Sequence, residues 1–289
     1  MDAALQQLVS GFSIGALYGL LAVGYALVYS VYRFTNWSFD ALLVGAAYAL
    51  WYALNWAGLP WWLAVPLALL AGAVLGWLLE FTAYRRLRER SAPRVLVLIS
   101  AMGANLMMIN LFTLIFGGAL RRLPELVPGG WRIGSVSLGR LDVATGLLAC
   151  AALGALAWVL RRTRVGMAIR ASAYDLETAA LMGVDANQLA MLVFGMSGVL
   201  AGLAGIMVGL RYAVYPYMGL VTLKAMIAAI LGGLGSLEGA LAGAFLLALT
   251  ETLIAATVST AWRDLLAFAV LIVVLLVFPN GLFGAREVA

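Results

Sequence analysis

Long apolar runs separated by short polar breaks form the pattern of this chain. The runs lie near residues 5–30, 39–57, 61–83, 95–118, 141–160, 187–210, 219–233, 237–257 and 265–278. Several approach or exceed the ~20 apolar residues that a helix needs to cross the hydrocarbon core of a bilayer. The pattern predicts an all-α, polytopic membrane protein, a single transmembrane domain over residues 1–289. It has eight or nine crossings, depending on whether the two runs beside Gly235 cross fully or re-enter.

Composition supports this class of protein. Of the residues, 65% are hydrophobic and only 11% are charged, whereas soluble domains average about 25% charged residues. The single cysteine, Cys150, allows no intramolecular disulfide, and there are no histidines. The net charge of +5 would suit nucleic acid, but the arginines cluster at the ends of apolar runs, as the positive-inside rule describes for membrane proteins. Composition therefore predicts contact with membrane lipid and not with nucleic acid.

The arginine clusters also predict an orientation. Residues 85–94 follow the third run and residues 161–170 follow the fifth, so parity puts both on one side. That side should be cytoplasmic, which places the N-terminus outside and the C-terminus in the cytoplasm. The loop 119–140 then lies outside, where its glycines, prolines and Trp131 are typical of a folded loop, although it carries arginines as well. The first run lacks the basic segment and cleavage pattern of a signal peptide, so we expect a retained span.

The polar segment 161–188, RRTRVGMAIRASAYDLETAALMGVDANQ, lies among these runs. It predicts a short helix outside the bilayer. Ser172 and Asp175 match a capping box, in which a side-chain oxygen accepts from an otherwise unpaired backbone N–H. Gly183 suits a left-handed C-cap at the other end of the helix.

One face of this predicted helix is apolar and shallow. Its stripe at helical spacing consists of Ile169, Ala173, Leu176, Ala180 and Val184. Such a face is typical of a docking surface for a partner, and the alternative is a solvated connecting helix. Asp185 with Gln188 suits the start of the next membrane helix.

Polar side chains interrupt the runs, and each is costly in lipid unless it has a partner or water. Asn36, Ser38 and Asp40 stand in the break RFTNWSFD between the first two runs. This break is either an interfacial turn or a segment that faces a protein-lined cavity. Further candidates for a polar path are Asn105, Asn110, Lys224 and Glu251.

These further candidates have structural alternatives. The two amides are equally consistent with hydrogen bonds between helices. Lys224 and Glu251 are consistent with a pair across helices or with a polar path. Glu80, just before the basic loop, is expected to hold an arginine at the interface.

Many of the 32 glycines follow small-xxx-small spacing. They mark one helix at Gly195, Gly198, Gly202, Gly205 and Gly209, and another at Gly239 and Gly243. This spacing predicts close helix packing, and helices packed this closely can slide.

Four blocks of the sequence resemble one known family. They are GFSIGALYGLLAVGYALVYSVYRFTNWSFDALLVGAAYA, RASAYDLETAALMGVDANQLAMLVFGMSGVLAGLAGIMVG, KAMIAAILGGLGSLEGALAGAFLLALTETL and RDLLAFAVLIVVLLVFPNGLFGAREV. In this order they are similar to the permease subunits of bacterial branched-chain amino acid ABC importers, of the LivH type. The resemblance spans nearly the whole chain.

The resemblance implies transport across the bacterial inner membrane, with no enzymatic activity and no cofactor in this chain. It implies a second permease subunit (a second copy or a related chain), two cytoplasmic ATPase subunits and a periplasmic solute-binding protein. The sequence has no G-x-x-x-x-G-K-[ST] phosphate-binding loop, so ATP hydrolysis is expected from the partners. The helix predicted at 170–183 becomes the coupling helix, with Arg170, Tyr174, Asp175, Glu177, Leu181 and Gly183 as its expected coupling residues.

The first break departs from the family pattern. Members commonly carry Asn-Phe-Ala-His-Gly-Asp there, whereas residues 36–41 of this chain read NWSFDA. The solute is therefore open among branched-chain amino acids, other amino acids, urea and short amides.

Three other classes of protein are alternatives. A purely structural membrane subunit would show fewer buried polar interruptions than this chain has. An ATP-independent carrier or channel for a small polar solute would explain Lys224, Glu251 and the broken segments, but not a capped cytoplasmic helix. An intramembrane protease is suggested by Ser236, but a serine–histidine dyad needs a histidine that the chain lacks. A Ser–Lys pair with Lys224 is the remaining form of that hypothesis.

Overall fold

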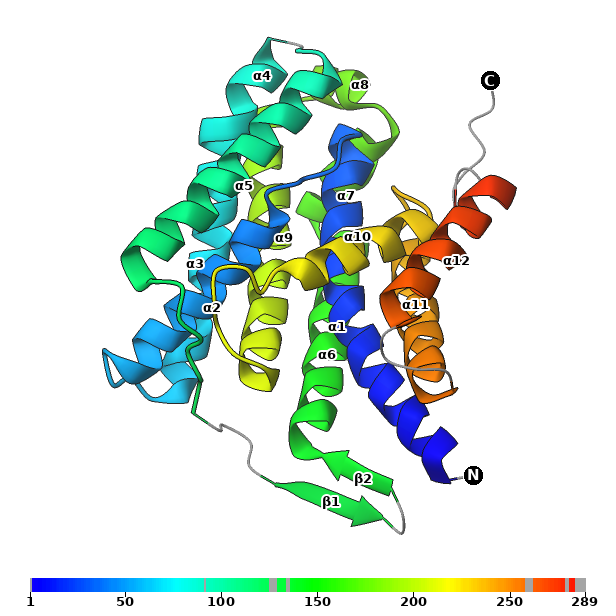
Figure 1. Ribbon diagram of the computed structural model, residues 1–289. Coiled ribbons are helices and arrows are strands. Elements are labelled where there is room, and N and C mark those ends of the chain that lie inside the picture. Colours follow the sequence, from blue (N-terminus) through cyan, green and yellow to red (C-terminus); the bar gives the residue numbers. More distant parts are fainter. Residues whose placement is uncertain are drawn as a thin grey trace. The chain divides into compact units, whose positions relative to one another are not determined.

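The computed structural model describes residues 2–90, 92–124, 129–133, 136–257, 262–278 and 281–283. These residues are nearly all helical (Figure 1). The elements are α1 (Asp2–Tyr32), α2 (Phe39–Asn55), α3 (Trp61–Leu79), η1 (Glu80–Tyr84), α4 (Arg85–Glu89), α5 (Arg94–Phe116), β1 (Gly130–Ile133), β2 (Val136–Gly139), α6 (Arg140–Arg162), α7 (Arg164–Tyr174), α8 (Leu176–Leu181), α9 (Ala186–Arg211), α10 (Leu220–Gly232), α11 (Leu237–Thr257) and α12 (Arg263–Val277). Each apolar run predicted from the sequence coincides with a helix. The element η1 is a π-helical turn that joins α3 to α4.

Helix length gives a first count of crossings. Among the described residues, six helices are long and apolar enough to span a membrane: Ser10–Tyr32, Trp61–Glu89, Arg94–Phe116, Arg140–Arg162, Ala186–Arg211 and Leu237–Ala256. The apolar helices α2, α10 and α12 are shorter, at 17, 13 and 15 residues. The predicted total of eight or nine crossings depends on these shorter helices and stays a prediction.

The described residues are nearly all helical, as predicted, and the exception is a hairpin in the loop before α6. There β1 and β2 form an antiparallel hairpin in which Gly130 lies opposite Gly139 and Ile133 opposite Val136. The sequences GWRI and VSLG are rich in β-branched and aromatic residues, which favour strands. Each strand has only four residues, which is too short for periodicity to distinguish a strand from a helix.

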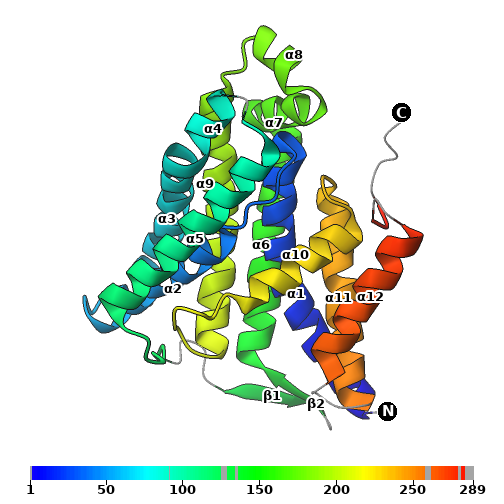
Figure 2. The same ribbon diagram turned by 45° about the horizontal axis from the view of Figure 1, so that its top comes forward.

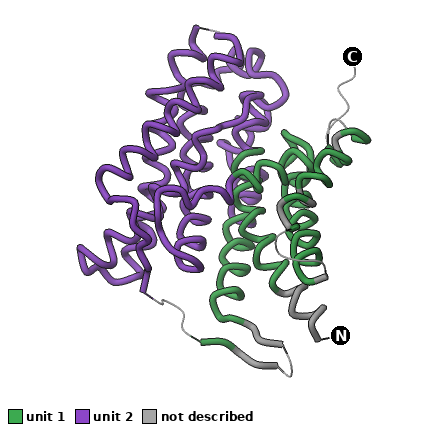
Figure 3. The backbone as a smooth tube through the Cα atoms, viewed as in Figure 1, with its two compact units in different colours: residues 1–26, 127–153, 223–289 green, residues 27–126, 154–222 purple. Residues whose placement is uncertain are grey.

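The contacts divide the chain into two compact units (Figure 3). Unit 1 comprises residues 1–26, 127–153 and 223–289, and unit 2 comprises residues 27–126 and 154–222. The chain passes from one unit to the other within α1, α6 and α10.

Unit 2 is built around close contacts of α9 with α3 and α2. The two views of the ribbon show α9 beside α3 (Figures 1 and 2). A methyl group at Gly198 would overlap the backbone carbonyl of Gly72, and one at Gly205 would overlap the carbonyl of Leu43. In the most apolar stretch of each helix, 78% of the residues of α9 are buried, against 28% for α5. The predicted glycine packing is therefore confirmed for α9, whereas α5 exposes the apolar side chains of a lipid-facing helix.

In unit 1, glycines also allow close backbone contact, here between α10 and α11. A methyl group at Gly243 would overlap the carbonyl of Ala228, and Gly239 lies against the carbonyl of Gly232. After α12, the backbone N–H of Leu282 donates to the carbonyl of Leu231 at 2.9 Å. The C-terminal carbonyls of α10, which lack partners within their own helix, are bonded in this way.

The glycine contacts give a stability prediction. Gly198→Ala should lower the free energy of unfolding by about 1–3 kcal/mol, because the added methyl group overpacks two touching backbones. Gly103→Ala on α5 is the matched control, since a methyl group there meets nothing within 4 Å. The control should be neutral or slightly stabilising, because alanine is the better helix former. Thermal unfolding in detergent compares the two variants, and equal midpoints would contradict the packing argument.

Candidate functional site

The break between α1 and α2 is closed by a buried polar cluster. Asn36 and Ser38 are both fully buried. The Oδ1 atom of Asn36 accepts from the backbone N–H of Ser38 at 3.0 Å and from the Tyr84 hydroxyl at 2.6 Å. The Ser38 hydroxyl donates to the carbonyl of Ala101 at 2.7 Å. The side chains thus supply the hydrogen bonds that regular helix would otherwise provide.

Asn105 joins this cluster from α5. Its Oδ1 atom accepts from the backbone N–H of Ala41 at 3.1 Å, in the first turn of α2, where N–H groups have no helical partner. Asn110 does not join. It is exposed, and its amide donates to the Leu106 carbonyl of its own helix at 2.7 Å. The two amides therefore differ in their contacts, and a place for both on one path stays a prediction.

Two buried polar atoms at the break have no hydrogen-bond partner among the described residues. They are Nδ2 of Asn36 and Oδ1 of Asp40. Asp40 lies in the first turn of α2, where the positive end of the helix dipole favours a carboxylate. Its Oδ1 atom lies against Gly219, where any Cβ would overlap the carboxylate. An unsatisfied buried group costs about 1–3 kcal/mol. The Asn36 amide and the Asp40 carboxylate therefore carry an energetic cost that a role in folding does not explain.

Lys224 and Glu251 form an ion pair within unit 1. The Nζ atom of Lys224 lies 3.1 Å from Oε1 of Glu251, and the Tyr18 hydroxyl donates to Oε2 at 3.0 Å. The Glu251 side chain is 0% exposed and the Lys224 side chain 22%. The pairing across helices that the sequence left open is therefore observed, while a place on a polar path stays a prediction.

The same contacts weigh against the protease hypothesis. Ser236 accepts the backbone N–H of Gly239 at 3.0 Å, at the start of α11. Since Lys224 is engaged with Glu251, the Ser–Lys pair that this hypothesis needs is not formed.

The polar segment after α6 contains two helices where one was predicted. The chain breaks at Asp175, which has an extended backbone and caps α8 by accepting from the N–H groups of Glu177 and Thr178. Ser172 lies inside α7 and is buried, and its hydroxyl has no hydrogen-bond partner in the part of the chain that the structure describes. The predicted capping box is therefore wrong, because Asp175 itself is the cap residue. Thr163 caps α7 instead, accepting from Gly166.

Other predictions for this segment are confirmed. Gly183 has a φ of +95° just after α8, as a left-handed C-cap requires. Asp185 caps α9 by accepting from the N–H groups of Asn187 and Gln188. The proposed apolar stripe is divided by the break at Asp175, so that Ile169 is buried while Ala180 is exposed.

The α7–α8 corner, residues 173–177, and the end of α8 point outward. Tyr174 is 94% exposed and Leu181 88%. The other expected coupling residues, Arg170, Asp175, Glu177 and Gly183, are exposed as well. Large exposed apolar groups beside charged ones are typical of a surface that binds another protein.

Hydrogen bonds lower the pKa of both aspartate caps. For Asp175 the donors are the Thr178 hydroxyl and then the backbone of Thr178 and Glu177. For Asp185 they are the backbone N–H groups of Gln188 and Asn187. A lowered folded-state pKa means that the caps stabilise the fold above the ordinary pKa of aspartate and lose this contribution as the pH falls through the folded-state pKa.

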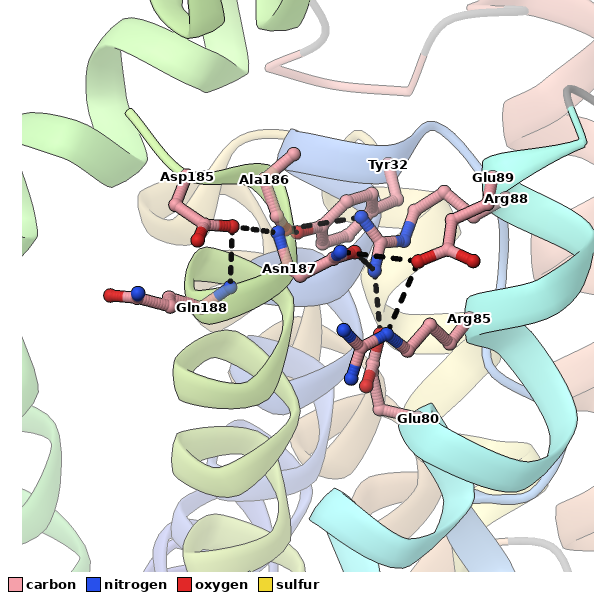
Figure 4. A network of polar contacts seen from close by, with 9 residues as sticks. All are labelled: Tyr32, Glu80, Arg85, Arg88, Glu89, Asp185, Ala186, Asn187 and Gln188. Carbon is pink, nitrogen blue, oxygen red and sulfur yellow. Dashed lines mark hydrogen bonds and ion pairs between the residues drawn. The ribbon is translucent and has the colours of Figure 1, made fainter. Parts of the chain in front are cut away.

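Arg88 connects the start of α9 to α4 and η1 (Figure 4). Its guanidinium donates to Glu80 at 2.6 Å, to the Asn187 side chain at 2.8 Å and to the carbonyl of Ala186 at 3.1 Å. It also lies over the Tyr32 ring. The expectation that Glu80 holds an arginine is confirmed. The contact also shows that the two basic loops lie on the same side of unit 2, as parity predicted.

Sequence reasoning missed the partners of the predicted site residues. Tyr84 and Tyr18 complete the two buried polar groups, and Arg88 organises the start of α9. Only Arg88 had a signal in the sequence, namely the acidic residue expected to hold an arginine.

Apolar helices of spanning length, buried polar groups and an exposed capped corner together define a multi-pass helical membrane protein. Residues 7–275 match the family model described as the permease component of the branched-chain amino acid transport system. The chain therefore belongs to the branched-chain amino acid transport permease family.

Curated relatives match over nearly the whole chain. LivH, the high-affinity branched-chain amino acid transport system permease protein of Salmonella typhimurium, is 34% identical over 98% of this chain and 96% of its own length. BraD of Pseudomonas aeruginosa, which carries the same description, is 32% identical over 98% of this chain and 97% of its own. The autoinducer 2 import system permease protein LsrC of Yersinia pestis is 36% identical over 46% of this chain and 40% of its own.

One solved structure is similar in fold. It is PsaBC from Streptococcus pneumoniae in complex with Fab, with a TM-score of 0.52 over 96% of this chain and 92% of that chain. Because the sequences are only 13% identical, the likeness concerns the fold alone.

The cluster at the break predicts a difference between two buried serines. Ser38→Ala should lower the free energy of unfolding by about 1–3 kcal/mol, because the Ala101 carbonyl loses its donor in a dry interior. Ser172→Ala is the matched control, since Ser172 is also buried and its hydroxyl bonds none of the residues that the structure describes. Chemical unfolding in detergent measures both, and a control as unstable as Ser38→Ala would refute the role of the hydrogen bond.

The ion pair predicts strong non-additivity. Lys224→Met should destabilise the protein by about 3–5 kcal/mol, since it leaves a buried carboxylate without its cation. Glu251→Met should cost less, because the partly exposed lysine can extend toward water. The double variant should be close to wild type. A double-mutant cycle of thermal unfolding tests this, and additive effects would show that the pair contributes no coupling.

Proposed function

We propose that the chain is the transmembrane permease subunit of an ABC importer that translocates branched-chain or related amino acids across the bacterial inner membrane. Family membership over residues 7–275 carries this proposal. The importer comprises a second permease, two cytoplasmic ATPases and a periplasmic solute-binding protein. Because the sequence lacks a phosphate-binding loop, the ATPase partners hydrolyse the ATP.

The proposed topology has eight or nine crossings in one domain, with the N-terminus outside and the C-terminus in the cytoplasm. The arginine distribution supports it. So does the contact of Arg88 with Ala186, which joins the two loops assigned to the cytoplasm.

The ATPases dock on the α7–α8 corner and the exposed residues of α7 and α8. Arg170, Tyr174, Asp175, Glu177, Leu181 and Gly183 make the contact. The exposed Tyr174 and Leu181 supply an apolar centre, and Arg170, Asp175 and Glu177 supply charges around it, the usual anatomy of a protein interface. Closure of the ATPases then moves the corner and rocks the helices to alternate access to the solute path.

The solute path includes the polar residues at the first break. Asn36 and Asp40 support this assignment, since each has a buried atom with no hydrogen-bond partner among the described residues. Ser38 and Asn105 fix the position of the break. The Ser38 hydroxyl donates to the Ala101 carbonyl, and Asn105 accepts from the N–H of Ala41. Lys224 and Glu251 line the path as a neutralised pair. Asn110 lines it as an exposed amide on α5.

The solute class follows the family. At residues 36–41, however, the chain departs from the common family motif. An importer of the same family for urea or short amides is the second candidate, favoured by the replaced histidine and glycine. A carrier that works without ATP is favoured by the buried Lys224–Glu251 pair, which is a feature of ion-coupled carriers. The capped, outward-facing α7–α8 corner favours the ABC importer.

Charge reversal on α8 tests the docking assignment. Glu177→Arg should abolish most of the ATP-driven uptake, because it reverses a charge at the interface while leaving an exposed position free of folding strain. The complex is reconstituted in vesicles with its ATPases and binding protein, and uptake of labelled leucine is measured. Arg122→Glu, an exposed charge reversal in the loop assigned to the outside, is the matched control.

The outcomes separate the hypotheses. Wild-type uptake that needs ATP and fails only in Glu177→Arg supports the proposal. Uptake by the purified chain without ATP would establish the carrier instead. Normal uptake by Glu177→Arg would remove α8 from the interface.

A further inference from the structure

Arg33 has an unusual backbone at the end of α1. Its φ is +54°, and it is the one non-glycine residue with a positive φ among the residues that the structure describes. A side chain with a Cβ rarely adopts this conformation, because the Cβ crowds the neighbouring backbone. Such a conformation persists where the surroundings hold it, and it clusters at switch regions.

The guanidinium of Arg33 is bonded to the end of α7. Its Nη2 atom donates to the carbonyl of Ala173 at 3.2 Å. Ala173 lies in the last turn of α7, where carbonyls have no partner within the helix and the dipole is negative. A cation is the complementary group for this position.

The segment that begins at Arg33 ends in the buried cluster. Three residues further on, Asn36 is bonded to Tyr84 of η1, and Ser38 to Ala101 of α5. On the other side of the Arg33–Ala173 bond, Asp175 is two residues away, at the junction of α7 and α8. A short, strained segment therefore connects the exposed corner to the buried polar break.

We propose that Arg33 is a positioning residue that transmits movement of the α7–α8 corner to the cluster at Asn36 and Ser38. The inference rests on the proposed function, in which partner ATPases move this corner. A single exposed hydrogen bond breaks and re-forms readily. When it breaks, the strained backbone is free to relax, and the peptide segment leading to Asn36 moves with it.

The rival explanation is that Arg33 only anchors the end of α1, where its N–H donates to the Tyr29 carbonyl at 2.8 Å. An anchor affects stability alone. A transmitting residue also changes how strongly two separate places respond to one another, and this coupling is measurable.

Hydrogen exchange on the wild-type complex gives the first test. The complex in vesicles, with its ATPases and binding protein, is compared with and without ATP plus orthovanadate. Exchange should change both in residues 173–177 and in residues 33–38. A change confined to residues 173–177 would overturn the proposal without the use of any variant.

Substitution of Arg33 gives the second test. Arg33→Gly keeps the positive φ without strain and removes the guanidinium. Its assembled complex should hydrolyse ATP as wild type does, but uptake per ATP should fall at least about fivefold. The exchange response at residues 33–38 should disappear while that at 173–177 remains. Arg33→Lys, which keeps a cation at the end of α7, should restore part of the uptake.

Arg90→Gly is the matched control, since Arg90 is also an exposed arginine at the end of a helix. It should leave uptake per ATP unchanged. Unchanged uptake and exchange in Arg33→Gly would overturn the inference. If the variant fails to assemble, the wild-type complex decides: no change in hydrogen exchange at residues 33–38 would overturn the inference as well. Absence of ATP-driven uptake in wild type would instead refute the proposed function.

Discussion

The constraint on which this structure depends is that a backbone in lipid must satisfy every N–H and C=O group internally. Helices meet it along the apolar runs, and each interruption therefore needs replacement partners. The break between α1 and α2 obtains them from side chains: Asn36 accepts from the N–H of Ser38, and the Ser38 hydroxyl serves the carbonyl of Ala101. Tyr84 joins the two from η1, itself an irregular helical turn. Irregular backbone at this point is thus tied to two neighbouring elements, and a movement of the break must change these bonds together.

Close helix packing sets what can move. Where Gly198 meets Gly72, two backbones touch and no side chains interdigitate. Side chains that fit into one another oppose sliding, whereas a smooth backbone contact leaves that movement open. The same contact is intolerant of added volume, so α3 and α9 must stay adjacent in any such movement. The polar residues act differently. The Lys224–Glu251 pair must stay together because Glu251 is wholly buried. Its separation would leave a charge without compensation.

Much of the fold follows from run length and glycine spacing, since both are properties of the sequence itself. The hairpin β1–β2 does not, because four-residue strands carry too little periodicity. Asn105 and Asn110 show a second limit. They lie five residues apart on α5, which is apolar on all sides, so the sequence does not reveal which one faces inward. A third limit is the capping box. Ser172 and Asp175 have the required spacing, but Asp175 caps a helix alone, and the pattern does not say where the chain turns. The positive φ of Arg33 has no signal in the sequence, because the residue pattern does not distinguish an arginine in this conformation from one in ordinary backbone.

The end of α7 and the start of α9, which lie on either side of α8, are held by different sets of hydrogen bonds. At the start of α9, Arg88 contacts Glu80, Asn187 and Ala186, and Asn187 also donates to Glu89 at 3.1 Å (Figure 4). Several charged hydrogen bonds in one network resist displacement together. At the end of α7, Arg33 contributes one exposed hydrogen bond, to Ala173, beside a strained backbone. A force on α8 meets both ends, and the displacement is larger at the more compliant one. In the proposed importer we therefore expect the end of α7 to move first, toward or away from Arg33, while the start of α9 stays attached to α4 and η1.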